Sequence, residues 1–367
     1  MLEKKEKILV AMSGGVDSSV VAALLVEVGY DVTGAFIINY DANKEGFGSC
    51  YTADYRDALR VAAKLSIPLL KLDFAKEYKE LVLDYMYQEY EKGRTPNPDV
   101  MCNKFVKFGV WLDKVREMGF DYIATGHYAK VESRKSKVES YELKIAKDTN
   151  KDQTYFLHQL NQAQLSYTLF PLGEYTKIEV RELAKKFDLP TANKDESMGI
   201  CFVGEVDMKE FLQNKIRPTP GNIVTFDGVV LGQHDGLAFY TIGQRHVGVG
   251  SQKSIKSKVD NDSKPLYVVD KRFDANELVV GHEDDPLLWK KEIMVGDVNW
   301  ISGHPPIFPL QCEVRLRHRQ ELQKSKVTKS LKSKVFVEFE KNQRAVTPGQ
   351  FAVFYKDGVC FGGGVIE

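Results

Sequence analysis

Runs of apolar residues of strand length alternate with helical patterns along the first half of the chain. The strand-like runs are residues 8–12, 31–38, 68–72 and 121–125, and apolar residues at helical spacing mark 19–28, 58–65 and 76–92. Parallel strands need helical crossovers between them, and these crossovers cover both faces of the sheet. The pattern therefore predicts a doubly wound parallel α/β sheet.

Beyond about residue 204 the pattern changes, and helical spacing almost disappears. Short β-like runs, separated by Gly, Asp and Asn, occur at 222–226, 266–269, 278–280, 311–316, 334–339 and 350–355. We expect three domains: the α/β domain at 1–204, a β-rich central domain at 205–283 and a small closed β-barrel at 284–367. The polar segments 133–140 and 251–264 are predicted to be loops.

Composition adds little to this organisation. The 367 residues suffice for two or three domains, with 43% hydrophobic and 28% charged residues, as is typical of a globular protein. Lys and Arg number 51, as do Asp and Glu, so net charge does not indicate a partner. No apolar run approaches a membrane span and the start is not typical of a signal peptide, so we expect a cytoplasmic protein.

Local charge and cysteine usage are more informative. Residues 313–334 hold eight Lys or Arg against two Glu, which fits either a solvated loop or a polyanion-binding surface. Arg315, Arg317 and Arg319 alternate along a strand-like run, so we expect them on one sheet face. The five cysteines are widely spaced and form no Cys-x-x-Cys, so neither structural disulfides nor a metal site built by the protein alone is expected.

Residues 11–18, Ala-Met-Ser-Gly-Gly-Val-Asp-Ser, join the first predicted strand to the first predicted helix. Backbone N–H groups at a helix start favour an anion, and the glycines allow a phosphate to approach. The spacing fits neither a Walker loop nor a dinucleotide fingerprint. Ser13 and Ser18 offer hydroxyl groups, and Asp17 suits phosphates chiefly if Mg²⁺ is shared between them. The alternative is an ordinary tight turn.

Two segments end in cysteines that could act as nucleophiles. Residues 93–104 contain two prolines, Asp99 as a candidate general acid or base, and Cys102, followed by Asn103, which is typical of a helix N-cap. We expect a thiol at a helix start beside a lysine to have a lowered pKa. The polar segment 194–202 leads to Cys201. Taken alone, either thiol is more often a buried spectator.

Together these segments resemble tRNA-specific 2-thiouridylases, a family that replaces the C2 oxygen of the wobble uridine of tRNA with sulfur. The loop 11–18 is similar to the pyrophosphatase loop of enzymes that activate a carbonyl by adenylylation. Further similar motifs follow in order at 125–128, 151–157, 240–245, 345–350 and 362–364. The resemblance covers nearly the whole chain and implies an adenine nucleotide alpha hydrolase-like first domain.

The resemblance implies three sets of site residues. The ATP set is Ala11, Met12, Ser13, Gly14, Gly15, Val16, Asp17, Ser18, Ile37 and Gly126, with Asp17 near Mg²⁺. The catalytic set is Cys102 as nucleophile, Cys201 as carrier of a persulfide, and Asp99. The set beside the target base and tRNA is Asn97, Pro98, Asp99, His127, Lys151, Asp152, Gln153, Arg317, His318 and Gln350. Ile37 and Met198 depart from the residues most frequent in the family.

The implied reaction uses ATP and Mg²⁺ to adenylylate the uridine C2 oxygen, after which sulfur arrives from a persulfide donor protein, a cysteine desulfurase or a sulfur relay. Two alternatives remain. One is a related ATP-dependent enzyme that delivers nitrogen, such as an amidating ligase or tRNA lysidine synthase, for which neither cysteine would matter. The other is a non-catalytic tRNA-binding protein that keeps a vestigial nucleotide domain.

Overall fold

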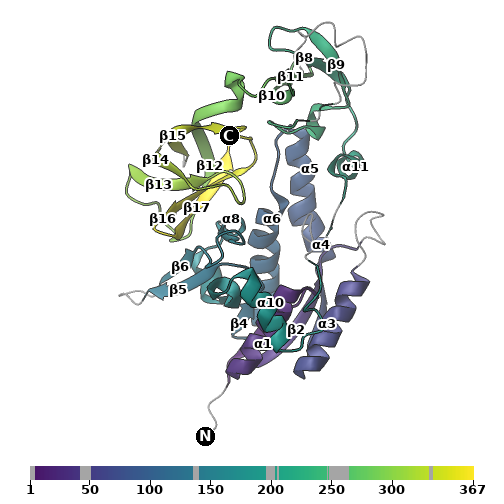
Figure 1. Cartoon of the computed structure of the whole chain (residues 1–367), viewed down its shortest axis with the longest axis vertical. Helices are drawn as coiled ribbons and strands as arrows, with labels where there is room; N and C mark the ends of the chain where they lie inside the picture. Colours follow the sequence, from purple (N-terminus) through teal and green to yellow (C-terminus); the bar gives the residue numbers. More distant parts are fainter. Residues whose placement is uncertain are drawn as a thin grey trace.

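A computed structural model of the chain describes three connected parts (Figure 1). The described residues are 5–41, 51–134, 140–195, 203–204, 206–245, 247, 264–329 and 334–367. An α/β part comes first, a small β part lies at the far end of a long helical run, and a barrel lies beside both. Within the described ranges, no helix is long and apolar enough to cross a membrane.

The first part is built on a five-stranded sheet in the order β3-β2-β1-β4-β7, and every neighbouring pair is parallel. The strands are β1 (Lys7–Ala11), β2 (Asp31–Ile38), β3 (Leu69–Asp73), β4 (Tyr122–Ala124) and β7 (Thr168–Leu169). The order reverses between β1 and β4, and ligands of such sheets bind outside the carboxyl ends at that point. The predicted parallel sheet is confirmed.

Helices cover both faces of this sheet. One face carries α1 (Val16–Val28), α3 (Thr52–Leu65) and α10 (Lys177–Lys186). The other carries α4 (Ala75–Tyr78), η1 (Lys79–Leu83), α5 (Asp84–Glu91), α6 (Pro98–Met101), η2 (Cys102–Val110) and α7 (Trp111–Glu117), where η1 and η2 are π-helical. Because successive strand residues point to opposite faces, Val10 packs in the first layer and Leu9 in the second.

Two details of this part differ from the sequence prediction. Helix α1 begins at Val16, three residues before the predicted start, because Gly15 already serves as the N-cap. The ends of the predicted loop 133–140 belong to a hairpin of β5 (Lys130–Arg134) and β6 (Ser140–Lys144), and residues 135–139 lie outside the described ranges. Shorter helices follow: α8 (Thr154–Leu157), α9 (Gln162–Ser166) and η3 (Pro171–Glu174).

The central part is a four-stranded sheet in the order β10-β11-β8-β9. Its elements are α11 (Met208–Gln213), β8 (Gly221–Val224), β9 (Val230–His234), η4 (Leu237–Phe239), β10 (Tyr267–Arg272) and β11 (Glu277–Gly281). Helix α11, which the sequence reading overlooked, stacks Phe211 on Tyr87 of α5, with ring centroids 5.9 Å apart. The central part is thereby packed against the α/β part.

The last part is a closed barrel whose strands run in the order β12-β15-β14-β13-β16-β17, with β12 also pairing with β17. Its elements are η5 (Pro286–Leu288), β12 (Trp289–Trp300), β13 (Leu310–Arg315), β14 (Gln323–Lys329), β15 (Val335–Arg344), β16 (Phe351–Lys356) and β17 (Val359–Ile366). The predicted closed barrel is confirmed. Strand β17 also pairs with β6, Cys360 opposite Leu143, so the hairpin of the first part extends the barrel sheet.

The predicted row of arginines on one strand face is wrong. Strand β13 ends at Arg315, and Arg319 has a left-handed backbone with a φ of 64°, so Arg317 and Arg319 lie in a turn. The Arg315 side chain is buried, with Nη1 2.9 Å from Oδ2 of Asp152. Arg315 therefore joins the barrel to the first part and is no part of an exposed phosphate-binding stripe.

Candidate active site

The turn between β1 and α1 is shaped by its glycines. Gly14 has a φ of 77°, and a Cβ there would lie 2.2 Å from the carbonyl oxygen of Asp54 on α3, so only glycine fits. Gly15 is the N-cap of α1 and, within the described residues, no side chain caps this helix. The first N–H groups of α1 are thus left for a ligand, and a 13-residue helix favours an anion there.

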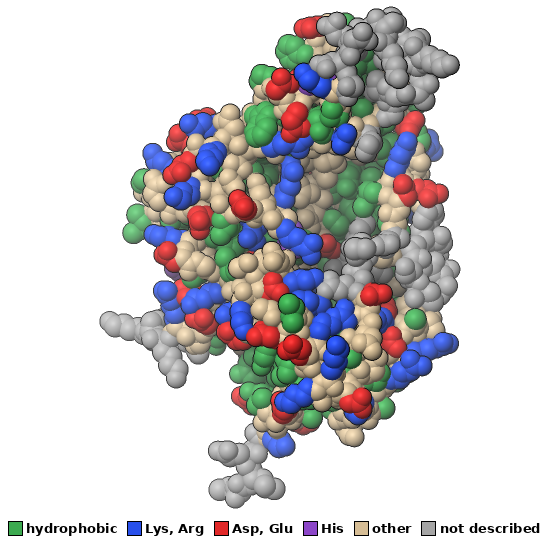
Figure 2. Space-filling model, viewed as in Figure 1, with side chains coloured by type: hydrophobic (Ala, Val, Ile, Leu, Met, Phe, Trp, Pro, Cys, Tyr) green, Lys and Arg blue, Asp and Glu red, His purple; other side chains and the backbone are tan. Residues whose placement is uncertain are grey.

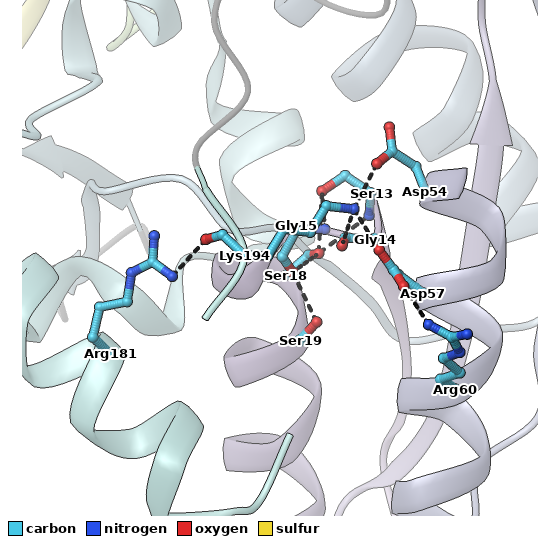
Figure 3. A network of polar contacts seen from close by, with 10 residues as sticks. All are labelled: Ser13, Gly14, Gly15, Ser18, Ser19, Asp54, Asp57, Arg60, Arg181 and Lys194. Carbon is cyan, nitrogen blue, oxygen red and sulfur yellow. Dashed lines mark hydrogen bonds and ion pairs between the residues drawn. The ribbon is translucent and has the colours of Figure 1, made fainter. Parts of the chain in front are cut away.

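The serines of the turn fold it back on itself (Figure 3). Ser18 Oγ accepts a hydrogen bond from Ser13 N at 3.2 Å and donates to the Gly15 carbonyl at 3.2 Å. Ser13 Oγ accepts from Gly15 N at 3.3 Å, and Ser19 Oγ donates to Gly15 O at 2.7 Å. The hydroxyl groups predicted to serve a phosphate here first fix the shape of the loop.

Lys194 joins three segments at this turn (Figure 3). Its Nζ lies 3.1 Å from Gly14 O, 2.7 Å from Asp54 Oδ1 and 2.6 Å from Asp57 Oδ2. Partial burial lowers the pKa of Lys194, but the hydrogen bonds and charges of the two aspartates outweigh this and raise it above the ordinary value. Arg181 of α10 donates to Lys194 O at 2.6 Å. The chain is thus fixed at the loop seven residues before Cys201.

Asp17 and Gly126 meet where the carboxyl ends of β1 and β4 come together. The Asp17 carboxylate accepts from Lys177 Nζ at 2.7 and 2.8 Å and from the Tyr128 hydroxyl at 3.0 Å. A Cβ on Gly126 would lie 3.1 Å from Ser18 N, so the backbone after β4 runs close to the loop. Ile37 lies near the end of β2, with its side chain buried under the second helical layer. The roles of Lys177, Lys194 and Tyr128 were missed: Lys177 lies outside every motif, and Tyr128 and Lys194 lie within the segments 125–128 and 194–202 but were given no role there.

The helical run that carries Asp99 and Cys102 begins earlier than predicted. Asn97 is its N-cap, with Oδ1 accepting from Val100 N at 3.3 Å, and Pro98 occupies the first helical position. The predicted N-cap at Asn103 is therefore wrong, since Asn103 donates to Phe156 O at 3.3 Å from inside the run. The wrong prediction treated the two prolines as loop formers.

Cys102 consequently lies one turn inside the helical run, fully buried, and Asp99 is in the first turn. The lysine expected beside the thiol, Lys104, has its Nζ 3.0 Å from Gln159 Oε1, and burial lowers its pKa. Cys201, the predicted persulfide carrier, lies outside the described residues. The position of Cys102 therefore differs from the helix-start position on which its predicted reactivity rested.

The predicted tRNA-contact residues include two buried side chains. His127 packs against Phe108 and Phe170, and its Nδ1 is 2.7 Å from Thr125 Oγ1. Burial, and next the charge of Lys107, hold the pKa of His127 well below its usual range. Asp152 is 1% exposed and bonded to Arg315, so its carboxylate faces the protein.

Four other predicted tRNA contacts lie near the place where the barrel meets the α/β part. Gln153 Oε1 accepts from Tyr128 N at 2.9 Å. Burial, and next the charges of Arg319, Arg315 and Lys151, lower the pKa of His318 to about 4, and its ring packs on Phe156 with centroids 4.6 Å apart. Arg317 is exposed and donates to Arg344 O at 3.1 Å. The turns at 151–153 and 317–318 therefore meet. Gln350, in contrast, lies at the 95–97 turn.

Lys and Arg side chains gather over the middle of one face, where the barrel, the central part and the α/β part meet (Figure 2). The surface is hollowed there, and acidic side chains are interspersed around it. Among the described residues, no group of three or more His, Cys, Asp and Glu side chains could hold a metal ion. The positive charge at this hollow therefore comes from Lys and Arg side chains, and it would attract a polyanion.

Comparisons with known proteins agree with this arrangement. Family models described as tRNA methyl transferase HUP domain, tRNA methyl transferase PRC-barrel domain and aminomethyltransferase beta-barrel domain match residues 6–205, 209–282 and 290–366. The chain is 45% identical over 371 residues to the tRNA-specific 2-thiouridylase MnmA of Shouchella clausii (strain KSM-K16), covering 100% of this chain and 98% of the relative.

Other similarities vary in strength. The chain is 46% identical over 363 residues to the tRNA-specific 2-thiouridylase MnmA of Geobacillus thermodenitrificans (strain NG80-2), covering 98% and 94% of the two chains. A solved 4-thiouridine synthetase, in a complex with RNA and bound ATP, gives a TM-score of 0.35 at 16% identity over 57% of this chain and 50% of that one, which is too little to inform function. On its full-length similarity to the curated relatives, this chain belongs to the family of tRNA-specific 2-thiouridylases.

Proposed function

We propose that this protein is a tRNA-uridine 2-sulfurtransferase that converts the wobble uridine, position 34, to 2-thiouridine and releases AMP and pyrophosphate. The observation that carries the proposal is the 45% identity to a curated thiouridylase over the whole chain. The uncapped start of α1 at the junction of β1 and β4 supports it, since a nucleotide phosphate fits there. A tRNA substrate also favours a cytoplasmic location.

The chemistry needs activation of a poor electrophile. Attack of the uridine C2 oxygen on the α-phosphorus of ATP forms a C2–O–AMP bond and expels pyrophosphate. The terminal sulfur of a persulfide on Cys201 then attacks C2, and AMP leaves with the oxygen. Cys102 next attacks the Sγ of Cys201. The S–S bond breaks, its electron pair stays on the sulfur bound to C2, and a Cys102–Cys201 disulfide remains for an external dithiol to reduce.

A variant of the sulfur step uses the same residues. If Cys102 attacks the persulfide first, hydrogen sulfide is released beside the activated uridine and becomes the nucleophile at C2. Both routes require a persulfide donor protein and two thiols that meet, and both leave the same disulfide. Asp99, in the first turn of α6, is proposed as the acid or base near the uridine.

The loop residues 11–18, with Ile37 and Gly126, are proposed to bind ATP through backbone N–H groups and the space at Gly126. Mg²⁺ would arrive with ATP and neutralise phosphate charge. Asp17 would be its protein ligand: Oδ1 accepts from Lys177 and Tyr128, whereas Oδ2 accepts from Lys177 and would have a second lone pair for the ion. Asp17 is also proposed to hold Lys177 beside the phosphates.

For tRNA, we propose contacts by Lys151, Gln153, Arg317 and His318, which gather at one junction. His127 and Asp152 are proposed to shape this surface from inside, since both are buried. Domain limits at 1–204, 205–283 and 284–367 are proposed from the succession along the chain of a parallel sheet, a four-stranded sheet and a closed barrel, with the β5–β6 hairpin of the first domain joined to the barrel sheet.

A nucleoside analysis tests the function. Unmodified tRNA is incubated with protein, ATP and a persulfide donor, then digested and analysed by mass spectrometry, with pyrophosphate measured in parallel. We expect 2-thiouridine from the wild type and at least about 100-fold less from Cys102→Ser and Cys201→Ser, because a hydroxyl cannot carry or release sulfane sulfur. Cys201→Ser should still release pyrophosphate with tRNA. Cys312→Ser, a buried barrel thiol whose pKa is raised to about 12 by burial, is the control.

Other outcomes identify the alternatives. Wild-type thiolation rates in both serine variants would exclude the two-cysteine scheme. A nitrogen-containing product would indicate an amidating or lysidine-forming enzyme. If the wild type released no pyrophosphate in the presence of tRNA, the protein would be a non-catalytic tRNA-binding protein.

A further inference from the structure

Gln350, at the junction between β15 and β16 in the barrel, bonds to the turn that leads into α6. Its Nε2 donates to Thr95 O at 2.9 Å and to Pro96 O at 3.1 Å. A side-chain amide nitrogen has two N–H groups, so both donors of Gln350 are used by this turn.

The oxygen of the same amide continues the connection. Gln350 Oε1 accepts from Asn97 Nδ2 at 3.4 Å, which orients the Asn97 side chain. Asn97 Oδ1 in turn accepts from Val100 N and caps α6. A continuous path of hydrogen bonds therefore runs from the barrel to the helix that bears Asp99 and ends beside Cys102.

The surroundings fix Gln350 against the turn. Thr95 N donates to Pro348 O at 2.9 Å, so backbone joins backbone beside the side-chain bonds. Gly349 has a φ of 91°, and a Cβ there would lie 3.0 Å from Thr95 N. The backbone at Gly349 therefore lies directly against the backbone of the 95–97 turn. Because Pro96 and Pro98 lack N–H groups, the turn makes few hydrogen bonds of its own, and the barrel supplies donors to its carbonyls.

We infer that Gln350 is a positioning residue for sulfur transfer, one that holds the 95–97 turn and the cap of α6 so that Asp99 and Cys102 keep their places. This role differs from the tRNA contact that family resemblance implies, because the amide is already committed within the protein. The catalytic part of the inference rests on the proposed function; the structural part does not.

The test compares Gln350→Glu with Gln311→Glu, an exposed position on β13 of the same barrel. Glutamate keeps the shape of Gln350 but places a carboxylate oxygen against the carbonyls of Thr95 and Pro96. Gln350→Leu, which removes the donors without adding charge, serves if Gln350→Glu unfolds. Hydrogen exchange at residues 99–102 is measured without tRNA, and single-turnover thiolation and tRNA dissociation constants are measured with it.

We expect exchange at Val100 to rise and the single-turnover rate at saturating tRNA to fall by about 10- to 100-fold, the effect of losing two hydrogen bonds of ordinary strength. The tRNA dissociation constant should change less than about three-fold, and Gln311→Glu should match the wild type in every measurement. Weakened tRNA binding with unchanged exchange and an unchanged saturating rate would overturn the inference and make Gln350 a tRNA contact. A wild type that fails to thiolate would refute the proposed function alone, since the exchange result would stand.

Discussion

Gly126 illustrates how a single missing side chain makes room at the proposed ATP site. A Cβ on Gly126 would lie 3.1 Å from Ser18 N and 3.2 Å from Asp17 Cβ, so a methyl group there requires a shift of the α1 start. We expect Gly126→Ala to raise the KM for ATP by about ten-fold, while tRNA affinity is unchanged. Gly232→Ala is the control, because its nearest neighbour would be 3.9 Å away. ATP-pyrophosphate exchange with tRNA measures the effect, and an unchanged KM would remove Gly126 from the ATP site.

Lys271 is a buried lysine that donates to Gly93 O at 2.9 Å from β10. Burial lowers its pKa from 10.5 to about 8, so between these values the folded protein binds fewer protons than the unfolded chain. The charge therefore destabilises the fold most below about pH 8, and this penalty disappears as the pH rises to 10.5. Relative to Lys271→Met, the wild type should gain thermal stability across that window, whereas an exposed control, Lys290→Met, should show no such trend.

At the residue scale, the sequence predicted site residues that lie within one motif. It did not predict residues that are distant from that motif in the chain and reach it only in the folded protein. The loop from Ser13 to Ser18 was predicted because strand, glycines and helix adjoin in sequence. Lys177 and Lys194, which bind the loop in the structure, stand about 160 and 180 residues away. Their chemistry is that of ordinary surface lysines until the fold brings them to Asp17 and Gly14.

Helix α10 matters because its first residue, Lys177, faces Asp17. Thr176 Oγ1 accepts from Glu179 N, and the Glu179 carboxylate accepts from Thr176 N, so the helix start is closed by a capping box. Thr176→Ala should destabilise this helix by about 1 kcal/mol, seen as roughly five-fold faster hydrogen exchange at Val180. Thr328→Ala, on β14, is the control. Equal exchange in both variants would contradict the capping role.

Helices and strands with a clear apolar pattern could be predicted from the sequence, whereas elements made mainly of polar residues could not. Strand β2 was predicted with its observed limits, 31–38, since it is buried on both faces. The hairpin β5–β6 is short and charged, so no apolar pattern predicts it; its strands pair with each other, and β6 also pairs with β17. The start of α6 was misplaced because Asn97 and Pro98 favour a helix start as much as a turn, and the hydrogen bond to Val100 N decides between them.

At the scale of the whole molecule, the pair of Arg315 and Asp152 joins the barrel to the α/β part in a buried setting. Desolvation raises the pKa of Asp152, and the hydrogen bond of Thr154 and the charge of Arg315 oppose this. Arg315→Met would leave a buried carboxylate without its cation, at a cost of about 3–5 kcal/mol.

Thermal unfolding checks this prediction, with the exposed Lys341→Met as control. Because a carboxyl with a raised pKa is stabilised by protonation, the deficit of Arg315→Met should shrink as the pH falls toward 5. Adding Asp152→Asn should restore part of the stability. A deficit independent of pH would show that the loss is one of packing rather than charge.

The pairing of β17 with β6 sets an order of events during synthesis. About 215 residues separate Lys144 from Val359, so at ordinary translation rates the finished β5–β6 hairpin waits roughly 10–40 s for its neighbour. An unpaired strand edge invites pairing with other nascent chains. The hairpin carries opposite charges across its strands, with Arg134 paired to Glu142 and Lys144 to Glu132. Because charged side chains at a strand edge disfavour pairing with other chains, we expect this edge to resist association until β17 is made.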